Sequence, residues 1–330
     1  MTMPRSARLD APGVLHHLMG RGIEKRKIFL DDQDRLDFIS RLEKLVKEDA
    51  MDIYAWALLP NHFHILCKTK KRPLSSSMRK LLTGYAVRFN RRHRRHGHLF
   101  QNRYKSIVCQ EDAYLAELVR YIHLNLLRAG IIKNLRELNE SPWSGQSALM
   151  ANMAGREWQN RGYVLSSFGR GARGRRNYLE FVEEGVSLGR RPELVGGGLV
   201  RSLGGWSAVI ASRRRGQKQV SDERILGDGD YVEGILAELG DMEKENLRVG
   251  KKRVSLKYLA EGICKEHGLS LAELRSGSRR HAVVQVREEL SRVAVMVQGY
   301  SGADVARYLG VTNSCITRPL SIGARKSDEL

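Results

Sequence analysis

The sequence predicts an α+β fold with an antiparallel sheet, followed by a small all-α domain. In residues 1–150, short alternating apolar runs that suit strands are interleaved with longer runs of helical periodicity. The connections between them are short, which favours antiparallel pairing with packed helices over a doubly wound parallel sheet. From about residue 230 only helical periodicity recurs. We therefore expect three regions: a mixed domain over 1–150, a Gly- and Arg-rich linker region with short helices over 151–229, and a helical domain over 230–330.

The mixed domain is expected to begin with a strand and a helix. Residues 14–21 have the pattern of a strand that Gly20 and Gly22 end. Asp31 is a suitable N-cap for the helix that follows, because its carboxylate can accept a hydrogen bond from a free backbone N–H of the first turn. Apolar residues then recur at helical spacing to about Glu48.

A hairpin is expected next, with strands over 53–58 and 62–68 joined by a turn at Pro60-Asn61. Apolar residues at helical or strand spacing then predict the remaining elements of this domain, which are a helix over 74–92, a strand over 104–109 and a helix over 113–127. The helical domain is expected to contain helices over 230–246, 255–267, 270–275, 282–298 and 301–309.

The chain is strongly basic, which indicates a polyanionic partner. It contains 57 Lys and Arg residues against 37 Asp and Glu residues, a formal net charge of +20. A hydrophobic content of 42% supplies enough apolar surface for folded domains. No apolar run reaches the roughly 18 residues that span a bilayer, so nucleic acid is the expected partner and a membrane is not. The four cysteines form no CxxC pair, which fits a reducing compartment, and we expect a cytoplasmic, nucleoid-associated protein.

The densest cluster of chemically active residues is Pro60-Asn61-His62-Phe63-His64. His62 and His64 lie two apart on an expected strand, so both imidazoles face one side while the ring between them faces the other. Such a pair can hold a divalent metal, although ordinary sheet histidines have the same spacing. Tyr121 and Asn125 lie four apart on an expected helix and share one face of it. Asn125 can offer a third, oxygen ligand, or it can simply satisfy backbone groups near a helix end.

Taken together, these residues resemble a known family. The run Leu-Leu-Pro-Asn-His-Phe-His-Ile-Leu, with Tyr-Ile-His-Leu-Asn-Leu-Leu-Arg-Ala-Gly further on, is similar to the single-tyrosine HUH transposases. Within them, the chain most resembles the tyrosine transposases associated with repetitive extragenic palindromes, over about residues 9–150. The resemblance implies a ferredoxin-like, or RRM-like, HUH nuclease fold. One departure is that Leu126 stands where the family often has proline, so the helix is expected to run further.

The resemblance also implies residue roles. His62, His64 and Asn125 would bind a divalent cation, and Tyr121 would cut single-stranded DNA through a 5′-phosphotyrosine intermediate. Histidine, asparagine and an oxygen-rich substrate suit Mg²⁺ or Mn²⁺ better than a structural zinc ion. The implied function is that of a transposase-like endonuclease and strand transferase acting on hairpin DNA as a monomer or homodimer. The competing hypotheses are a domesticated, non-catalytic DNA-binding regulator and an RNA-binding protein.

A basic stretch free of acidic residues is expected to bind the single-stranded hairpin. Its cations could neutralise phosphates while neighbouring rings stack on unpaired bases. A solvated basic helix face is the alternative. The cations are Arg88, Arg91, Arg92, Arg94, Arg95, Arg103 and Lys105, and the rings are Phe89, His93, His96, His98, Phe100 and Tyr104.

The tail over about 255–318 is similar to the C-terminal DNA-binding domain of the bacterial chromosomal replication initiator. Ala306, Gly310 and Ile316 fall at the small, turn and buried positions of a helix-turn-helix. Pro319 departs from the pattern and should stop the recognition helix early. We therefore expect this domain to bind duplex DNA largely through phosphate contacts. The expected contact residues are Arg275, Arg279, Arg280 and Arg318.

Overall fold

The computed structural model describes residues 9, 13–70, 72–151, 155–189, 191, 194, 222–251, 254–298 and 300–317. The chain divides into two compact units, Met1–Leu239 and Gly240–Leu330. Helix α10 (Gly229–Lys251) begins at the expected domain limit, whereas the two units divide within it. No helix among the described residues is long and apolar enough to cross a membrane.

The first unit is built on a five-stranded sheet with the spatial order β2-β3-β1-β4-β5, and four of its strands pair antiparallel. The short strand β5 (Ile225–Leu226) adds to β4 in parallel. The chain order β1-α1-β2-β3-α2-β4 gives the split βαβ arrangement of ferredoxin-like folds, so the α+β prediction is confirmed. The elements are β1 (Leu15–Arg21), α1 (Asp32–Lys47), β2 (Met51–Leu59), β3 (His62–Thr69), α2 (Leu74–Arg92), β4 (Lys105–Cys109) and α3 (Glu111–Arg128).

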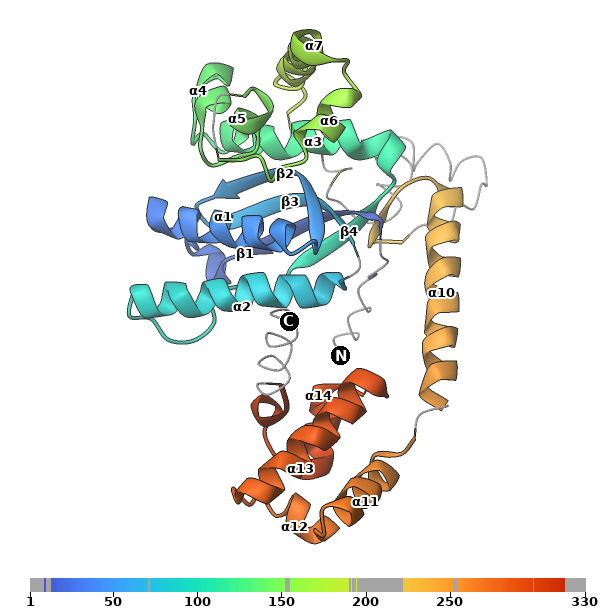
Figure 1. Cartoon of the computed structure of the whole chain (residues 1–330). Helices are drawn as coiled ribbons and strands as arrows, with labels where there is room; N and C mark the ends of the chain where they lie inside the picture. Colours follow the sequence, from blue (N-terminus) through green and yellow to red (C-terminus); the bar gives the residue numbers. More distant parts are fainter. Residues whose placement is uncertain are drawn as a thin grey trace. The chain divides into compact units, whose positions relative to one another are not determined.

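Two hydrophobic cores lie on the two faces of this sheet. Helices α1 and α2 cover one face, where residues such as Phe38 and Tyr85 pack against Phe63 of β3. Helix α3 covers the other face, where Ile122 and Leu126 are fully buried. Figure 1 shows the sheet between these two layers. The helix α3 continues past Asn125, as the substitution of leucine for proline predicts.

Four short helices follow α3, and the sequence analysis assigned the last two of them to the linker region. Tyr178 and Val182 are fully buried in the core on the α3 face, so these helices are part of the first unit. Their composition hides this role because Gly and Arg dominate the segment and only a few apolar residues recur. The four helices are α4 (Leu135–Glu140), α5 (Gln146–Leu149), α6 (Arg161–Ser166) and α7 (Gly171–Glu184).

The second unit is helical, as expected. Its helices enclose a core that includes Val283, Leu290 and Ile316. Gly310 ends α14 with a φ of +67°, in the left-handed region that glycine adopts without strain, and another helix starts at residue 313. Ala306 is buried beside this turn, so the helix-turn-helix geometry is present. Arg318 and Pro319 lie outside the described residues. The helices are α11 (Leu256–Glu266), α12 (Leu271–Arg275), α13 (His281–Arg292) with a π-helical turn at Val293–Val297, and α14 (Gly302–Leu309).

Candidate nuclease site

Strand β3 presents its two histidines on the face that α3 covers. Phe63, between them, is fully buried in the opposite core. On β1, Gly20 pairs with Phe63, and a Cβ atom at Gly20 would lie 2.4 Å from the phenylalanine ring. The missing side chain therefore lets Phe63 occupy its position, which fixes the strand segment that carries His62 and His64.

Helix α3 brings Tyr121 and Asn125 to the same place. The ring centroids of His64 and Tyr121 are 6.0 Å apart, and those of His62 and His64 are 5.3 Å apart. All four side chains line one cavity of about 370 Å³. The four residues that the sequence selected are thus neighbours in space, although 57 residues separate His64 from Tyr121 in the chain.

Both histidines are in the neutral form that a metal ligand requires. Burial, reinforced by the positive charge of Arg21, lowers the pKa of His62 to about 4. Burial, together with His17, His62 and Arg21, holds the pKa of His64 well below its usual value. A neutral imidazole retains a lone pair on one ring nitrogen at physiological pH, so proton competition for a cation is weak there.

Hydrogen bonds at the Nδ1 atoms select which nitrogen is available. His62 Nδ1 lies 2.6 Å from Asn61 Oδ1, while Asn61 Nδ2 donates to the carbonyl oxygen of Lys25 at 3.1 Å. Because the carboxamide oxygen can only accept, His62 Nδ1 carries the proton and Nε2 keeps its lone pair. Such an outer partner orients a metal-ligating histidine and fixes its tautomer.

His17 provides the corresponding partner for His64, and the sequence analysis missed it. Its Nε2 atom lies 3.0 Å from His64 Nδ1, and the two rings stack with centroids 5.2 Å apart. His17 is fully buried on β1. Strand alternation alone would place it on the α3 face, but only the pairing of β1 with β3 shows that it meets His64.

We predict that His17 controls metal affinity through His64. His17→Leu removes the hydrogen-bond partner and should weaken Mn²⁺ binding by about 10- to 100-fold. His17→Gln retains an acceptor and should recover most of the affinity. The measurement is Mn²⁺ titration by electron paramagnetic resonance without DNA, with thermal melting to verify folding. His16→Gln, on the neighbouring buried position, is the matched control and should bind Mn²⁺ normally. Equal affinities for all three variants would exclude this role.

Asn125 is half-buried, and its Nδ2 atom is buried with no hydrogen-bond partner among the described residues. The carboxamide is therefore not held through this atom by a structural hydrogen bond. Two neutral imidazoles and a carboxamide around one cavity are a donor set that fits a divalent cation of the Mg²⁺ or Mn²⁺ type.

Arg128 supplies a positive charge beside Tyr121, and the sequence analysis did not select it. Its guanidinium lies over the Tyr121 ring, 5.4 Å from the ring centroid, and Nη2 donates to the carbonyl oxygen of Gly185 at 3.3 Å. A cation at this distance favours the negative charge that develops on a phenol oxygen as it becomes a nucleophile.

The expected DNA-contact arginines fall into two groups. Arg103 and Lys105 line the cavity, together with Arg21, which the sequence analysis did not select. Arg88 and Arg92 already have acidic partners. The first bonds Asp37 at 3.2 Å, and the second bonds both Asp31 and Asp34. Arg91 and Arg94 are exposed, and Arg95 lies over the Phe89 ring, 5.7 Å from its centroid.

Two of the rings expected to stack on bases are core residues, which corrects that part of the prediction. Phe89 is 1% exposed and Tyr104 is 8% exposed, and both pack on the α1/α2 face of the sheet. His93 is half-buried, and its Nε2 atom lies 2.9 Å from Asp34 Oδ2. The available rings are those of Phe100, which is half-buried, and of the exposed His96 and His98.

Asp31, Asp34 and His93 form a second cluster of groups that could ligate a metal. Arg92 already donates to both carboxylates, and its hydrogen bond lowers the pKa of Asp31 to about 2. A cation there would have to displace the guanidinium. The cluster therefore ties α1 to the end of α2 as an ion-pair network.

In the second unit, the expected contact arginines lie on or beside the segment after α12. Arg275 Nε donates to the carbonyl oxygen of Tyr308 at 2.9 Å, and Arg280 pairs with Glu273 at 2.5 Å. Arg279 is exposed. Arg318 lies beyond the described residues.

Comparisons with known proteins agree with this site. The family model for "Transposase IS200 like" matches residues 12–125, a range that contains both histidines, Tyr121 and Asn125. A solved REP-associated tyrosine transposase bound to a REP hairpin is similar at 18% identity and a TM-score of 0.38, over 45% of this chain and 86% of that chain. No curated protein matches. Residues 12–125 of this chain thus belong to the IS200-like transposase family.

Proposed function

We propose that the chain is a metal-dependent endonuclease and strand transferase that acts on single-stranded hairpin DNA through a 5′-phosphotyrosine. The observation that carries this proposal is the cavity shared by His62, His64, Tyr121 and Asn125. The family match supports a transposase-type activity for this domain.

The reaction follows from the groups present. The Tyr121 oxygen attacks the phosphorus, the bond from phosphorus to the 3′ oxygen breaks, and that oxygen takes up a proton to become a free 3′-hydroxyl. The phosphotyrosyl ester conserves the bond, so a second 3′-hydroxyl can attack it and rejoin the strands without a nucleotide cofactor. Free tyrosine has a pKa near ~10, so the adjacent Arg128 guanidinium assists by favouring the phenolate.

His62, His64 and Asn125 would hold the divalent cation. When bound, Mg²⁺ or Mn²⁺ would act as a Lewis acid and template for the phosphate. Arg21, Arg103 and Lys105 would hold the DNA backbone beside the cavity by neutralising phosphates. We propose that the exposed Arg91 and Arg94 extend this contact surface.

The second unit is proposed to bind duplex DNA. Besides the helix-turn-helix, it has a preformed basic loop, because the buried Arg287 donates to the carbonyl oxygens of Leu274 and Ser278 on either side of Arg275. Backbone carbonyls held in this way fix the segment that presents Arg275, Arg279 and Arg280. Ordered cations of this kind suit phosphate contacts.

We predict that the two units prefer different DNA. A fragment of residues 1–239 should favour single-stranded hairpins, and a fragment of residues 240–330 should favour duplex. The first fragment must extend beyond residue 150 because Tyr178 and Val182 complete its core. The slope of log affinity against log salt should be about −0.9 per phosphate contact on duplex and about −0.7 on single strands. Fluorescence anisotropy over a salt series measures both. A second fragment that binds no duplex at low salt would exclude the duplex-binding role.

The endonuclease proposal is tested by incubating the full chain with Mn²⁺ and single-stranded hairpin oligonucleotides from the genome that encodes it. We expect a DNA adduct that survives denaturing electrophoresis. Hairpin binding without any adduct, across a broad hairpin set, would instead support the non-catalytic regulator.

A further inference from the structure

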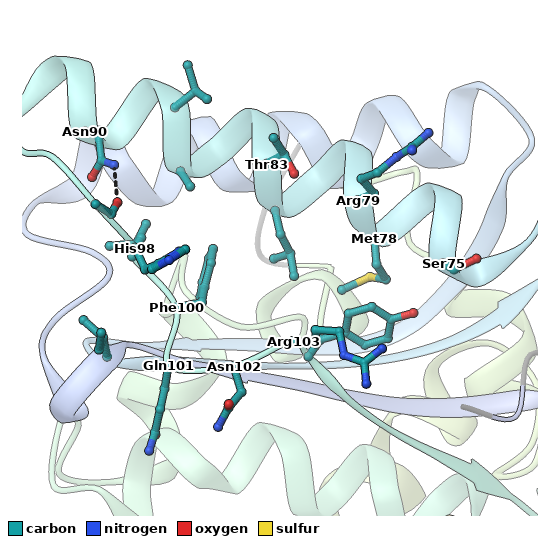
Figure 2. Close-up of a pocket in the computed structure, with 17 residues that line it drawn as sticks. Ser75, Met78, Arg79, Thr83, Asn90, His98, Phe100, Gln101, Asn102 and Arg103 are labelled. Atoms are coloured by element: carbon teal, nitrogen blue, oxygen red, sulfur yellow. Dashed lines mark hydrogen bonds between the residues drawn. The ribbon is translucent and has the colours of Figure 1, made fainter. Parts of the chain in front are cut away.

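A second and larger cavity lies beside the candidate nuclease site. It has a volume of about 720 Å³ and lies between α2 and the segment over 97–104 (Figure 2). Asn90 of α2 donates to the carbonyl oxygen of Gly97 at 2.9 Å, which ties this segment to the helix. The cavity is therefore a built feature of the first unit, and the Tyr121 chemistry does not use it.

The two cavities share one wall. Gln101, Asn102 and Arg103 line both of them. In Figure 2, His98 and Phe100 point toward α2, whereas Gln101 and Asn102 point away from it. The segment is thus a partition with a different set of side chains on each side. A DNA strand crossing it would have its backbone near both cavities.

The lining matches an unpaired nucleobase. Apolar groups from Met78 and Leu82 lie opposite the half-buried ring of Phe100, whose T-shaped contact with Phe63 fixes its plane. Amide and imidazole groups from Asn90 and His98 can form hydrogen bonds with the edge of a base. No acidic side chain lines this cavity among the described residues, which favours an anionic ligand.

We propose that this cavity binds an unpaired base of the DNA strand whose backbone passes the Tyr121 cavity. The proposal rests on the proposed function and deepens it by assigning where the single strand is read. Phe100 and the apolar side of α2 enclose the base, and Arg79 and Arg103 hold the adjoining phosphates. Because apolar enclosure acts on the base and not on the phosphates, its contribution can be measured separately from charge.

The test compares two probes of equal charge, a dT 12-mer and an abasic 12-mer with the same phosphates. We expect the wild-type chain to bind the dT 12-mer at least fivefold more tightly, the lower range for one stacked base. Thr83→Trp adds a ring at the cavity wall and should remove most of that preference while leaving abasic affinity unchanged. Ala86→Met fills the cavity less and should remove part of it. Ser40→Trp, an exposed position on α1, is the matched control and should leave the preference intact.

Equal binding of the two probes by the wild-type chain would overturn this proposal, as would a preference that survives in folded Thr83→Trp. A change of oligomeric state in that variant with an unchanged base preference would also overturn it, because the cavity would then be a protein contact. Adduct formation is scored separately. A base preference without an adduct would refute the nuclease, and an adduct without a base preference would refute only the base-binding cavity.

Discussion

Tyr121→Phe should abolish covalent adduct formation while leaving hairpin affinity within about twofold of the wild type. Only the hydroxyl is lost, so the half-buried ring keeps its packing against His17 and His64. The phosphates are held by cations on other elements, namely Arg21, Arg103 and Lys105. Adduct formation is measured by denaturing electrophoresis and affinity by anisotropy on the same hairpin.

Tyr114→Phe is the matched control, since it removes a hydroxyl from the same helix at a residue that does not line the cavity. It should retain adduct formation. Adduct at the wild-type level from Tyr121→Phe would eliminate this tyrosine as the nucleophile.

His62→Ala and His64→Ala should each lower cleavage by about a thousandfold or more, because several kcal/mol of charge stabilisation depend on the bound cation. Hairpin affinity should change little. Both imidazoles are neutral at pH 7, so removing one changes no charge that faces the phosphates. Mn²⁺ titration without DNA should show weakened binding in both variants.

His96→Ala, an exposed histidine away from the cavity, serves as the control for this pair. His64→Gln guards against unfolding, since it keeps a polar group near His17. Chelation by EDTA should reproduce the loss in the wild-type chain. Cleavage that persists in EDTA, or in folded His62→Ala, would contradict the metal role.

The sequence could predict the site where the geometry is local. Strand alternation places His62 and His64 together, and helical spacing places Tyr121 beside Asn125. That the two pairs meet depends on how α3 packs on the sheet, which the sequence implied only through its resemblance to a family. His17 escaped because its contact with His64 depends on the register of two strands 47 residues apart.

The basic stretch shows a limit of pattern reading. Phe89 was expected to stack on bases, yet it continues the apolar side of α2 that includes Met78, Leu81 and Tyr85. That spacing was a usable signal of burial. Arg92 had no such signal, because its partners Asp31 and Asp34 come from another helix and only the fold brings them together.

The most direct measurement is the identity and polarity of the DNA–protein bond. The wild-type chain is incubated with Mn²⁺ and a single-stranded hairpin, the adduct is digested with a protease and a nuclease, and the modified peptide is sequenced by mass spectrometry. We expect a 5′-phosphate on Tyr121 and a free 3′-hydroxyl on the released strand. A nucleotide on any other residue, or a 3′-phosphate linkage, would contradict the proposed mechanism.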